Sequence, residues 1–595
     1  MNVPGVPVTG GWPAWRFLTR LIAFRPWLWG PNALSIVLLI MLENVPGLLA
    51  RQFFDWLSAG ATSLEPFWWL LALLGAATAG RVAFLVGCQL TNAPFMYTSA
   101  ALLQHNMLRR LLRLPGAAAL PHSSGEALSR FRDDAEETSL FLIPFNDLIA
   151  WTLFALAGLV VMISVNPTIT VGVFLPLVAV SALVHAGRTR IESYRRAVRV
   201  ATADVTAYLA DVFGATATIQ AATAEARVVD RFRQLNAVRL HKAIRDRVLD
   251  QLLQSVSRNT ANLGTGGILL LASQGLQAGT FTVGDFALFV FYLGWIGEFT
   301  AMFGTVLAKY RQADVSFGRM VELLQGAAPG ALVQHRPGLL KSDVSVPSAS
   351  VDRTGLEVLE VTRVGYVYPG SDRGVRDISF RLERGQCLVV TGRVGSGKTT
   401  LLRVLLGLLP RDAGSISWNA VPIDDPARTL VPPRCAYTPQ TPRLFSDSLR
   451  NNLLLDLSGD GTEAALQHAL GTSQLEPDLI TLHDGLASEV GARGVALSGG
   501  QVQRAAMARM LVRRPELMVL DDLSSLDGPT ESALWRALRL DRSATILAAS
   551  HRRAVLAQAD RIVVLEDGRL IDQGSLGELL ERCAEMRRLW DSAST

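Results

Sequence analysis

The chain has 595 residues, enough for about three to four ordinary domains, so a single hydrophobic core is excluded. Its 57 Lys and Arg against 52 Asp and Glu give a net charge of only +5, which gives little support to a nucleic-acid binder. The mean hydropathy of +0.28 averages two unlike halves: long apolar runs between about 28 and 307, and a soluble α/β composition after about 355. The four cysteines lack metal-like spacing, which predicts reduced structural thiols at Cys88, Cys387, Cys435 and Cys583.

The N-terminal residues 1–12 are rich in Pro and Gly and lack the basic region of a secretory signal. Trp15, Leu18, Leu21 and Ile22 share one helical face, which predicts a short helix lying in a membrane interface. A disordered tail up to Arg25 is the alternative.

Six segments reach the roughly 20 apolar residues that a membrane-spanning helix needs: 28–50, 66–88, 141–164, 168–187, 252–273 and 284–307. Arginine gathers between spans two and three and again between spans four and five. The opposite loops, near 57–65, 165–168 and 274–283, contain no Lys or Arg. Because cytoplasmic loops carry the basic excess, both termini are predicted to be cytoplasmic, and Arg81 and Arg258 to lie toward cytoplasmic span ends.

Acids inside a membrane helix usually face a cavity, a partner or water. Glu298 in the last span is a candidate for lining a transport route, whereas Glu43 in the first is interpreted as hydrated near the outer surface. Further candidates for a pocket, or simply for membrane-interface positions, are Asn44, Trp151, His185 and Trp295.

The two basic stretches between spans are rich in helix formers. About 25 helical residues out and as many back would extend some 40 Å beyond the membrane. Residues 326–355, with several Pro, Gly and Ser, have the composition of a linker.

The second half begins with short apolar strands that alternate with helices. A strand at 388–391 and a helix at 399–409 flank a G-x-x-x-x-G-K-[ST] motif, a context that favours a phosphate-binding loop. Its backbone N–H groups would wrap phosphates, Lys398 would reach the β- and γ-phosphates, and Thr399 would ligate Mg²⁺. The motif is Gly392-Arg393-Val394-Gly395-Ser396-Gly397-Lys398-Thr399, followed by Thr400.

About a hundred residues later stands Leu497-Ser498-Gly499-Gly500-Gln501. Tyr368 precedes the loop, with Tyr366 as the less favoured alternative. Gln440 and His551 follow short apolar segments, and the apolar run 517–520 ends in Asp521. Singly, each has a structural explanation, such as a core tyrosine or a surface glutamine.

In this order and spacing the motifs resemble the ATP-binding cassette (ABC) ATPases. Together with six spans, the whole chain resembles an exporter-type half-transporter. The resemblance implies an all-α six-helix transmembrane domain (1–325), a linker (326–355) and an α/β P-loop ATPase domain (356–595). It also implies two ATP molecules sandwiched between two nucleotide domains, with Ser498, Gly499, Gly500 and Gln501 acting on the partner's ATP.

The same resemblance assigns the site residues. Tyr368 would stack on adenine, and residues 392–400 would bind the phosphates. Mg²⁺ would be held by Thr399, Gln440 and Asp521, and the catalytic roles would fall to Asp522, His551 and Gln440. The tips of the two predicted hairpins resemble coupling helices. The first is 122–137, with Gly125, Glu126 and Arg130, and the second is near 208–214, followed by 219–221 and Glu225. Simple surface helices are the alternative.

The chain departs from the family pattern in three places. Asp522 stands where the family has the catalytic glutamate, and a shortened Ser524-Ser525-Leu526-Asp527 replaces Ser-Ala-Leu-Asp. Gly491-Ala492-Arg493-Gly494 replaces Gly-Glu-Arg-Gly. An Asp is one methylene shorter than a Glu, and a misplacement of about 1 Å can cost about 10²-fold in rate. The resemblance therefore implies a heterodimer in which this chain's own ATP turns over slowly.

The predicted function is ATP-driven export of a hydrophobic or amphipathic small molecule, lipid or peptide, across a bacterial plasma membrane. The predicted partners are a second half-transporter and the lipid bilayer, without nucleic acid. Import through an exporter-type fold and a regulatory ABC subunit with little transport of its own are the alternatives.

Overall fold

The computed structural model describes residues 12–60, 64–116, 124–277, 280–335, 355–455, 457, 459, 461–491, 494–523, 525–540 and 544–592. Within its helices, the side chains of 173–192 and of some residues between 253 and 301 are not described. The chain forms two compact units. The first comprises Met1–Arg109 with Leu120–Leu339, and the second comprises Arg110–Ala119 with Leu340–Thr595.

Helices make up the first unit, and the boundaries of the long ones follow local signals. Asn166 accepts a hydrogen bond from the backbone N–H of Ile169 at the start of α8, and Thr282 and Asp285 form a capping box at the start of α11. The helices are α1 (Ala14–Phe24), α2 (Pro26–Met41), α3 (Asn44–Ser58), α4 (Glu65–Leu111), α5 (Ser124–Ser129), the π-helical turn η1 (Arg130–Asp134), α6 (Ala135–Leu140), α7 (Leu142–Val165), α8 (Pro167–Gly214), α9 (Thr216–Ala221), α10 (Glu225–Gln277), α11 (Val283–Leu323) and the 3₁₀ turn η2 (Pro329–Val333).

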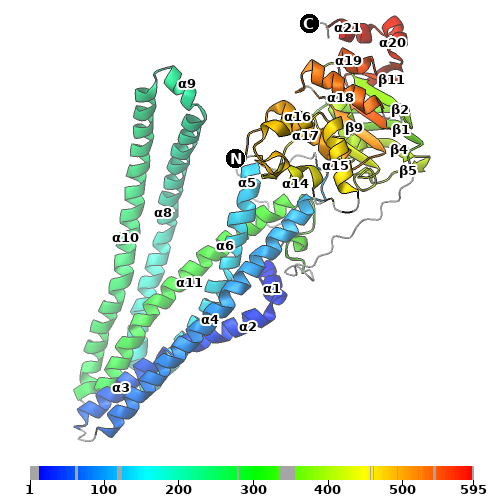
Figure 1. Ribbon diagram of the computed structural model, residues 1–595. Helices are drawn as coiled ribbons and strands as arrows, with labels where there is room; N and C mark the ends of the chain where they lie inside the picture. Colours follow the sequence, from blue (N-terminus) through cyan, green and yellow to red (C-terminus); the bar gives the residue numbers. More distant parts are fainter. Residues whose placement is uncertain are drawn as a thin grey trace. The chain divides into compact units, whose positions relative to one another are not determined.

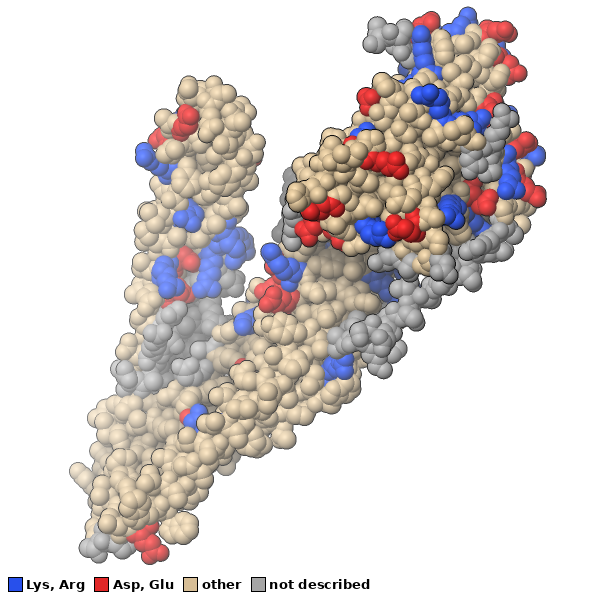
Figure 2. Space-filling model, viewed as in Figure 1, with Lys and Arg blue, Asp and Glu red and all other residues tan. Residues whose placement is uncertain are grey.

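The helices α8 and α10 run side by side as a hairpin that α9 closes (Figure 1). Contacts along the hairpin include a hydrogen bond from the Tyr208 hydroxyl to the Val228 carbonyl at 3.1 Å and an Arg195–Asp250 ion pair at 2.8 Å. Lys and Arg side chains gather on this hairpin (Figure 2). The reversal occurs in α9, so the tip predicted near 208–214 was placed too early: α8 stays helical through Gly214.

Three helical stretches among the described residues are long and apolar enough to cross a membrane: Pro26–Ser58, Glu65–Leu111 and Gly125–Val165. Val283–Trp295 is a shorter apolar helix within α11. The predicted spans at 168–187 and 252–273 lie in α8 and α10, where many side chains are outside the described set. The helical membrane domain expected from the sequence is thus present, and the count of six spans stays a prediction.

Two charged residues of the membrane helices are placed differently from the expectation. Glu43, predicted to be hydrated near the outer surface, forms an ion pair with Arg81, which was predicted to lie toward a cytoplasmic end. Because the two side chains are paired, they lie at the same depth, so one cannot be near the outer surface while the other is near the cytoplasmic end. A charge on an apolar helix is costly unless paired, and each residue supplies the other's partner. The side chain of Glu298 lies outside the described residues.

The N-terminal helix α1 buries Leu18 and Leu21 of the expected face, but with Ala14 and Phe17 in place of Trp15. Ala14, Phe17, Leu18 and Leu21 are buried, whereas Trp15 is half exposed. Phe17 stacks on Phe317 of α11 with ring centroids 4.6 Å apart. The helix is therefore held by side-chain packing within the first unit.

The start of the predicted linker packs against this first unit. Asn106 of α4 donates hydrogen bonds to the carbonyls of Leu332 (2.9 Å) and Gln334 (3.0 Å). Residues 336–354 of the linker lie outside the described residues.

The second unit contains a mixed six-stranded sheet of order β12-β11-β3-β10-β9-β6, in which only β12 runs antiparallel. An antiparallel sheet of order β2-β1-β4-β5 and a small β7-β8 ladder complete its strands. Their bounds are β1 (Val358–Val367), β2 (Gly374–Glu383), β3 (Cys387–Thr391), β4 (Ala413–Trp418), β5 (Val421–Pro422), β6 (Cys435–Thr438), β7 (Asp447–Ser448), β8 (Glu489–Val490), β9 (Leu517–Asp521), β10 (Thr545–Ala549), β11 (Arg561–Glu566) and β12 (Arg569–Gly574).

The strands β3, β9 and β10 are buried along their whole length, as expected for parallel strands covered on both faces. One apolar cluster lies between the two sheets, and another packs β3, β9 and β10 against helices that include Trp535 of α18. The helices of this unit are α12 (Lys398–Leu405), α13 (Pro426–Thr429), α14 (Leu449–Leu454), α15 (Thr462–Thr472), α16 (Glu476–Thr481), the 3₁₀ turn η3 (Gly485–Ala487), α17 (Gly499–Leu511), α18 (Gly528–Leu540), α19 (Arg553–Leu556), α20 (Leu576–Arg582) and α21 (Ala584–Ser592).

A glycine at the start of α11 permits a close approach to α3. The Gly284 N–H donates to the Asp55 carboxylate at 3.1 Å, and a Cβ at Gly284 would overlap the Arg51 carbonyl. We expect Gly284→Ala to lower the unfolding free energy by about 1–3 kcal/mol, because the backbones must move apart. Thermal unfolding in detergent measures this.

Gly294→Ala is the matched control on the same helix, since no described atom lies within 4 Å of a Cβ built there. It should leave stability unchanged or raise it by up to about 1 kcal/mol. Equal effects of the two substitutions would contradict the close contact.

Candidate active site

The phosphate-loop motif lies between β3 and α12, as expected. Gly392 has φ +147° and Gly397 has φ +100°, and Gly397 is the N-cap of α12. A Cβ at Gly397 would lie 2.8 Å from Val375, so both the backbone angle and the space require glycine. The loop therefore presents backbone N–H groups at a helix N-terminus, the arrangement that binds anions. The helix ends at Leu405, earlier than predicted, and Gly407 follows with φ +68°.

The Lys398 side chain folds back over its own loop. Its Nζ donates to the carbonyls of Gly392 (2.6 Å) and Arg393 (2.9 Å). Burial lowers the pKa of Lys398, and the nearby carboxylates of Asp522 and Asp521 oppose this shift. The ammonium group is thus held beside the loop, where it can reach a phosphate.

Asp521 ends β9 and is fully buried. Its Oδ1 accepts from the Thr399 hydroxyl at 2.8 Å, and its Oδ2 accepts from the Tyr437 hydroxyl at 3.1 Å. Burial raises the pKa of Asp521, and these two hydrogen bonds lower it. The carboxylate therefore joins the first turn of α12 to β9 and β6.

The oxygen donors here fit a hard divalent cation. Among the described residues, no three His, Cys, Asp or Glu side chains gather as a metal site. Mg²⁺ instead commonly binds through one or two protein oxygens and takes water and phosphate oxygens as its other ligands. The adjacent oxygens of Thr399 and Asp521 match that requirement, and Gln440 shares their cavity.

That cavity measures about 480 Å³ and brings most of the predicted residues together. The Tyr368 hydroxyl lies 3.3 Å from the Thr400 hydroxyl, whereas Tyr366 is buried and packs edge-on against Tyr368. Tyr368 is therefore the tyrosine that lines the cavity. The other lining residues are Ser371, Arg373, Gly374, Val394, Gly395, Gly397, Lys398, Thr399, Thr400, Gln440, Asp521, Asp522 and His551. Gly392, Arg393 and Ser396 belong to the loop and are not among these lining residues.

The backbone holds Asp522 firmly. Its φ is +40°, its N–H donates to the Ala549 carbonyl at 3.0 Å, and its own carbonyl accepts from Gln503 at 3.1 Å. Its Oδ1 is buried with no hydrogen-bond partner among the described residues, and its Oδ2 lies 3.9 Å from His551 Nδ1, beyond hydrogen-bond range. The Asp522 carboxylate therefore lines the cavity without forming a hydrogen bond to His551.

The signature Ser498–Gln501 is built as a helix start. Ser498 and Gln501 form a capping box on α17. Gln501 also donates to Asp478, which in turn binds Arg504 through two hydrogen bonds of 2.6 and 2.9 Å. Ser498 and Gly499 are exposed, and none of residues 498–501 is among the described residues lining the cavity. The signature is thus intact, rigid and open to a partner.

Glycines shape the segments around the signature. A Cβ at Gly500 would lie 3.2 Å from the Ser525 carbonyl, so the signature and the shortened loop pack closely. Gly491 has φ +92°, and a Cβ there would lie 2.6 Å from the Phe445 carbonyl. Ala492, Arg493 and Ser524, where the chain departs from the family pattern, lie outside the described residues.

Sequence reasoning missed several supporting residues. Tyr437 anchors Asp521, and fully buried Gln503 accepts from the Ser525 N–H at 3.0 Å while it donates to Asp522. Buried Glu531 pairs with Arg552, which follows His551. The sequence offered one indication of these roles: Tyr437 lies close to Gln440, and Arg552 directly follows His551.

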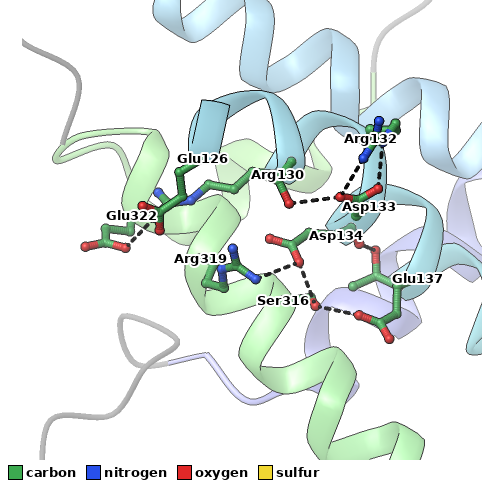
Figure 3. Close-up of polar contacts among 11 residues, drawn as sticks. Glu126, Arg130, Arg132, Asp133, Asp134, Glu137, Ser316, Arg319 and Glu322 are labelled. Carbon is green, nitrogen blue, oxygen red and sulfur yellow. Dashed lines mark hydrogen bonds and ion pairs between the residues drawn. The ribbon is translucent and has the colours of Figure 1, made fainter. Parts of the chain in front are cut away.

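The described part of the first predicted loop tip, from Ser124 onward, is bound to α11 through Arg130 and Asp134. Arg130 is 1% exposed and donates to Glu126 and Glu322, each at 3.2 Å (Figure 3). Asp134 accepts from Ser316 (3.1 Å) and Arg319 (3.3 Å). Leu128, Arg132 and Asp133 of the same segment are exposed, and its role as a coupling helix stays a prediction.

Trp151 and Trp295, proposed as pocket residues, pack together with ring centroids 5.2 Å apart inside an aromatic cluster that includes Phe154 and Tyr292. Asn44 accepts from the Tyr292 hydroxyl at 3.0 Å. The His185 side chain lies outside the described residues.

Comparison with known proteins agrees with this geometry. Residues 34–298 match the family model "ABC transporter transmembrane region", and residues 375–525 match the model "ABC transporter". A probable multidrug resistance ABC transporter ATP-binding/permease protein of Bacillus subtilis is 27% identical over 95% of both chains. An ATP-dependent lipid A-core flippase of Bordetella avium is 27% identical over 80% of this chain and 79% of its own.

Among solved structures, a bacterial Atm1-family ABC exporter with ATP bound has a TM-score of 0.73 and 23% identity. The match covers 95% of this chain and 98% of the exporter. At this identity the likeness establishes the fold, which joins a helical membrane domain to an ABC ATPase domain.

Gln503 connects α17 to the backbone on both sides of Leu523. We expect Gln503→Met to lower the unfolding free energy by about 1–3 kcal/mol and ATP turnover several-fold, because the Ser525 N–H loses its acceptor and the Asp522 carbonyl its donor. Thermal unfolding and phosphate release measure the two effects. Gln467→Met, on the exposed face of α15, should change neither. If Gln503→Met had the stability and ATP turnover of the wild type, the proposed role of the Gln503 side-chain amide would be wrong.

Proposed function

Because this chain belongs to the ABC transporters and fuses an exporter-type membrane domain to an ATPase domain, we propose that it is one half of an asymmetric heterodimeric exporter. In that pair, Ser498–Gln501 complete the partner's ATP site. This chain's own phosphate loop holds an ATP that turns over slowly. The proposal rests on one contrast, an intact signature beside a shortened carboxylate at Asp522.

The geometry around Asp522 supports slow turnover. Hydrogen bonds from its N–H and to its carbonyl fix the main chain, so the backbone cannot advance to make up for the missing methylene. The carboxylate already ends 3.9 Å from His551. A base that polarises water must reach the water within hydrogen-bond distance. ATP binding does not need this reach, since it relies on the loop, Lys398 and Tyr368.

The remaining residues take the roles that their positions allow. Thr399, Asp521 and Gln440 would hold Mg²⁺, which when bound would neutralise charge on the phosphates. Tyr368 would stack on adenine, and Gln440 and His551 would contact the γ-phosphate from the exposed cavity wall. Ser498 and Gly499 are exposed, as action on another chain's ATP requires.

We further propose a hydrophobic or amphipathic small molecule, lipid or peptide as substrate. The support is the apolar membrane domain and the multidrug and lipid A-core names of two relatives. Both termini and the ATPase domain are proposed to lie on the cytoplasmic side of a bacterial plasma membrane. The support for this is the placement of arginines.

The first test is the activity of the chain by itself. We expect the purified chain to bind ATP but to hydrolyse it slowly. Co-purification with a half-transporter that has a glutamate after its own motif aspartate should restore turnover and transport into inverted vesicles. Robust ATPase activity of a dimer of this chain alone would contradict the asymmetry.

The second test changes the length of the base. We expect Asp522→Glu to raise ATP turnover at this chain's site by about 10- to 100-fold, because the added methylene restores reach. Single-turnover hydrolysis measures the step directly. Asp484→Glu adds the same methylene at an exposed position and should have no effect. Unchanged turnover in Asp522→Glu, with ATP still bound, would refute the geometric argument.

A further inference from the structure

The side chain of Arg393, the first variable residue of the phosphate loop, points toward the C-terminal helix α21. Its Nε donates to Glu585 Oε1 at 2.5 Å, and its Nη2 donates to Glu585 Oε2 at 2.9 Å. The two side chains are 192 residues apart in the sequence. Paired parallel hydrogen bonds between a guanidinium and a carboxylate fix both distance and orientation.

Glu585 is the fixed member of this pair. Its side chain is 4% exposed, whereas that of Arg393 is 58% exposed. Arg588 also donates to Glu585, at 3.3 Å. The neighbouring Met586 and Leu589 are buried in the apolar cluster beneath β3, β9 and β10. A carboxylate on a helix anchored in this way acts as a rigid attachment point for the loop.

The other end of α21 contacts the segment that follows His551. Arg553 Nε donates to the Trp590 carbonyl at 2.6 Å, and its guanidinium lies 5.0 Å from the centroid of the Trp590 ring. Arg553 starts α19, two residues after His551. One short helix therefore bridges the start of the phosphate loop and the segment that carries His551.

The attachment acts on the backbone that holds the side chain of Lys398. The Arg393 carbonyl accepts from Lys398 Nζ at 2.9 Å and from the Ser396 N–H at 3.1 Å. If the Arg393 side chain were released, only these two hydrogen bonds would hold the peptide group, and both come from within the loop itself. With its outside attachment gone, the loop would vary more in conformation, and nucleotide binding would have to offset the entropy cost of ordering it.

We propose that Glu585 is a positioning residue, and that α21 uses it to hold the phosphate loop in its nucleotide-accepting conformation. The inference rests on nucleotide binding by this loop, which is part of the proposed function. It assigns to the C-terminal helix a control over nucleotide affinity at this chain's own site. It does not depend on whether the partner is a different chain.

The test measures ATP affinity at this site in the full-length transporter. Photo-crosslinking with 8-azido-ATP, resolved by subunit, gives the dissociation constant for this chain alone. We expect Glu585→Gln to raise it by about 10-fold, the size of one lost charge-assisted contact. Transport should recover at saturating ATP, because the chemistry is untouched. The exposed Glu581→Gln on α20 is the matched control and should bind as the wild type does.

Arg393→Gln keeps the test valid if the Glu585 variant folds poorly, since Arg393 is largely exposed. Combined with Glu585→Gln, it should raise the dissociation constant no further than the single variants do, because the two residues act as one unit. Binding within twofold of wild type for Glu585→Gln, or fully additive effects, would overturn the inference. Absence of labelling in the wild-type chain would instead overturn the proposed nucleotide site.

Discussion

The burial of the Asp521 carboxylate is the constraint on which the nucleotide site depends. A fully buried carboxylate must be satisfied by hydrogen bonds, and Asp521 takes them from Thr399 on α12 and Tyr437 on β6. Three elements distant in the sequence are thereby locked at one sheet edge. The phosphate loop, the oxygens of Thr399 and Asp521 that we propose to hold Mg²⁺, and the start of the following loop take their positions from this arrangement.

The backbone of the next residue, Asp522, is also held in one conformation. Asp522 follows the locked end of β9, with a positive φ and main-chain hydrogen bonds to Ala549 and Gln503. A flexible segment could let an aspartate approach a water as closely as a glutamate does. Here the scaffold holds the backbone, so the length of the side chain decides its reach. In the proposed function, an aspartate at position 522 therefore slows hydrolysis, while nucleotide binding relies on other residues.

In the first unit, too, charged side chains with little solvent exposure are paired with groups of opposite charge. Glu43 pairs with Arg81 between membrane helices, Arg51 pairs with Asp285 at 2.8 Å, and Arg130 connects the π-helical turn to α11. Each pair joins segments far apart in the chain. Because an unpaired charge in such surroundings is costly, each pair selects one arrangement of its helices.

Much of this protein follows from the sequence alone. The apolar runs, the phosphate loop and the signature depend on residues adjacent in the chain, so local patterns were sufficient to predict them. The exposure of Trp15 on α1, the Glu43–Arg81 pair and the position of the second loop tip were not predicted correctly. The supporting roles of Tyr437, Gln503 and Glu585 were missed. Each of these depends on a partner that folding brings from elsewhere in the chain, and only the tertiary structure decides which partner that is.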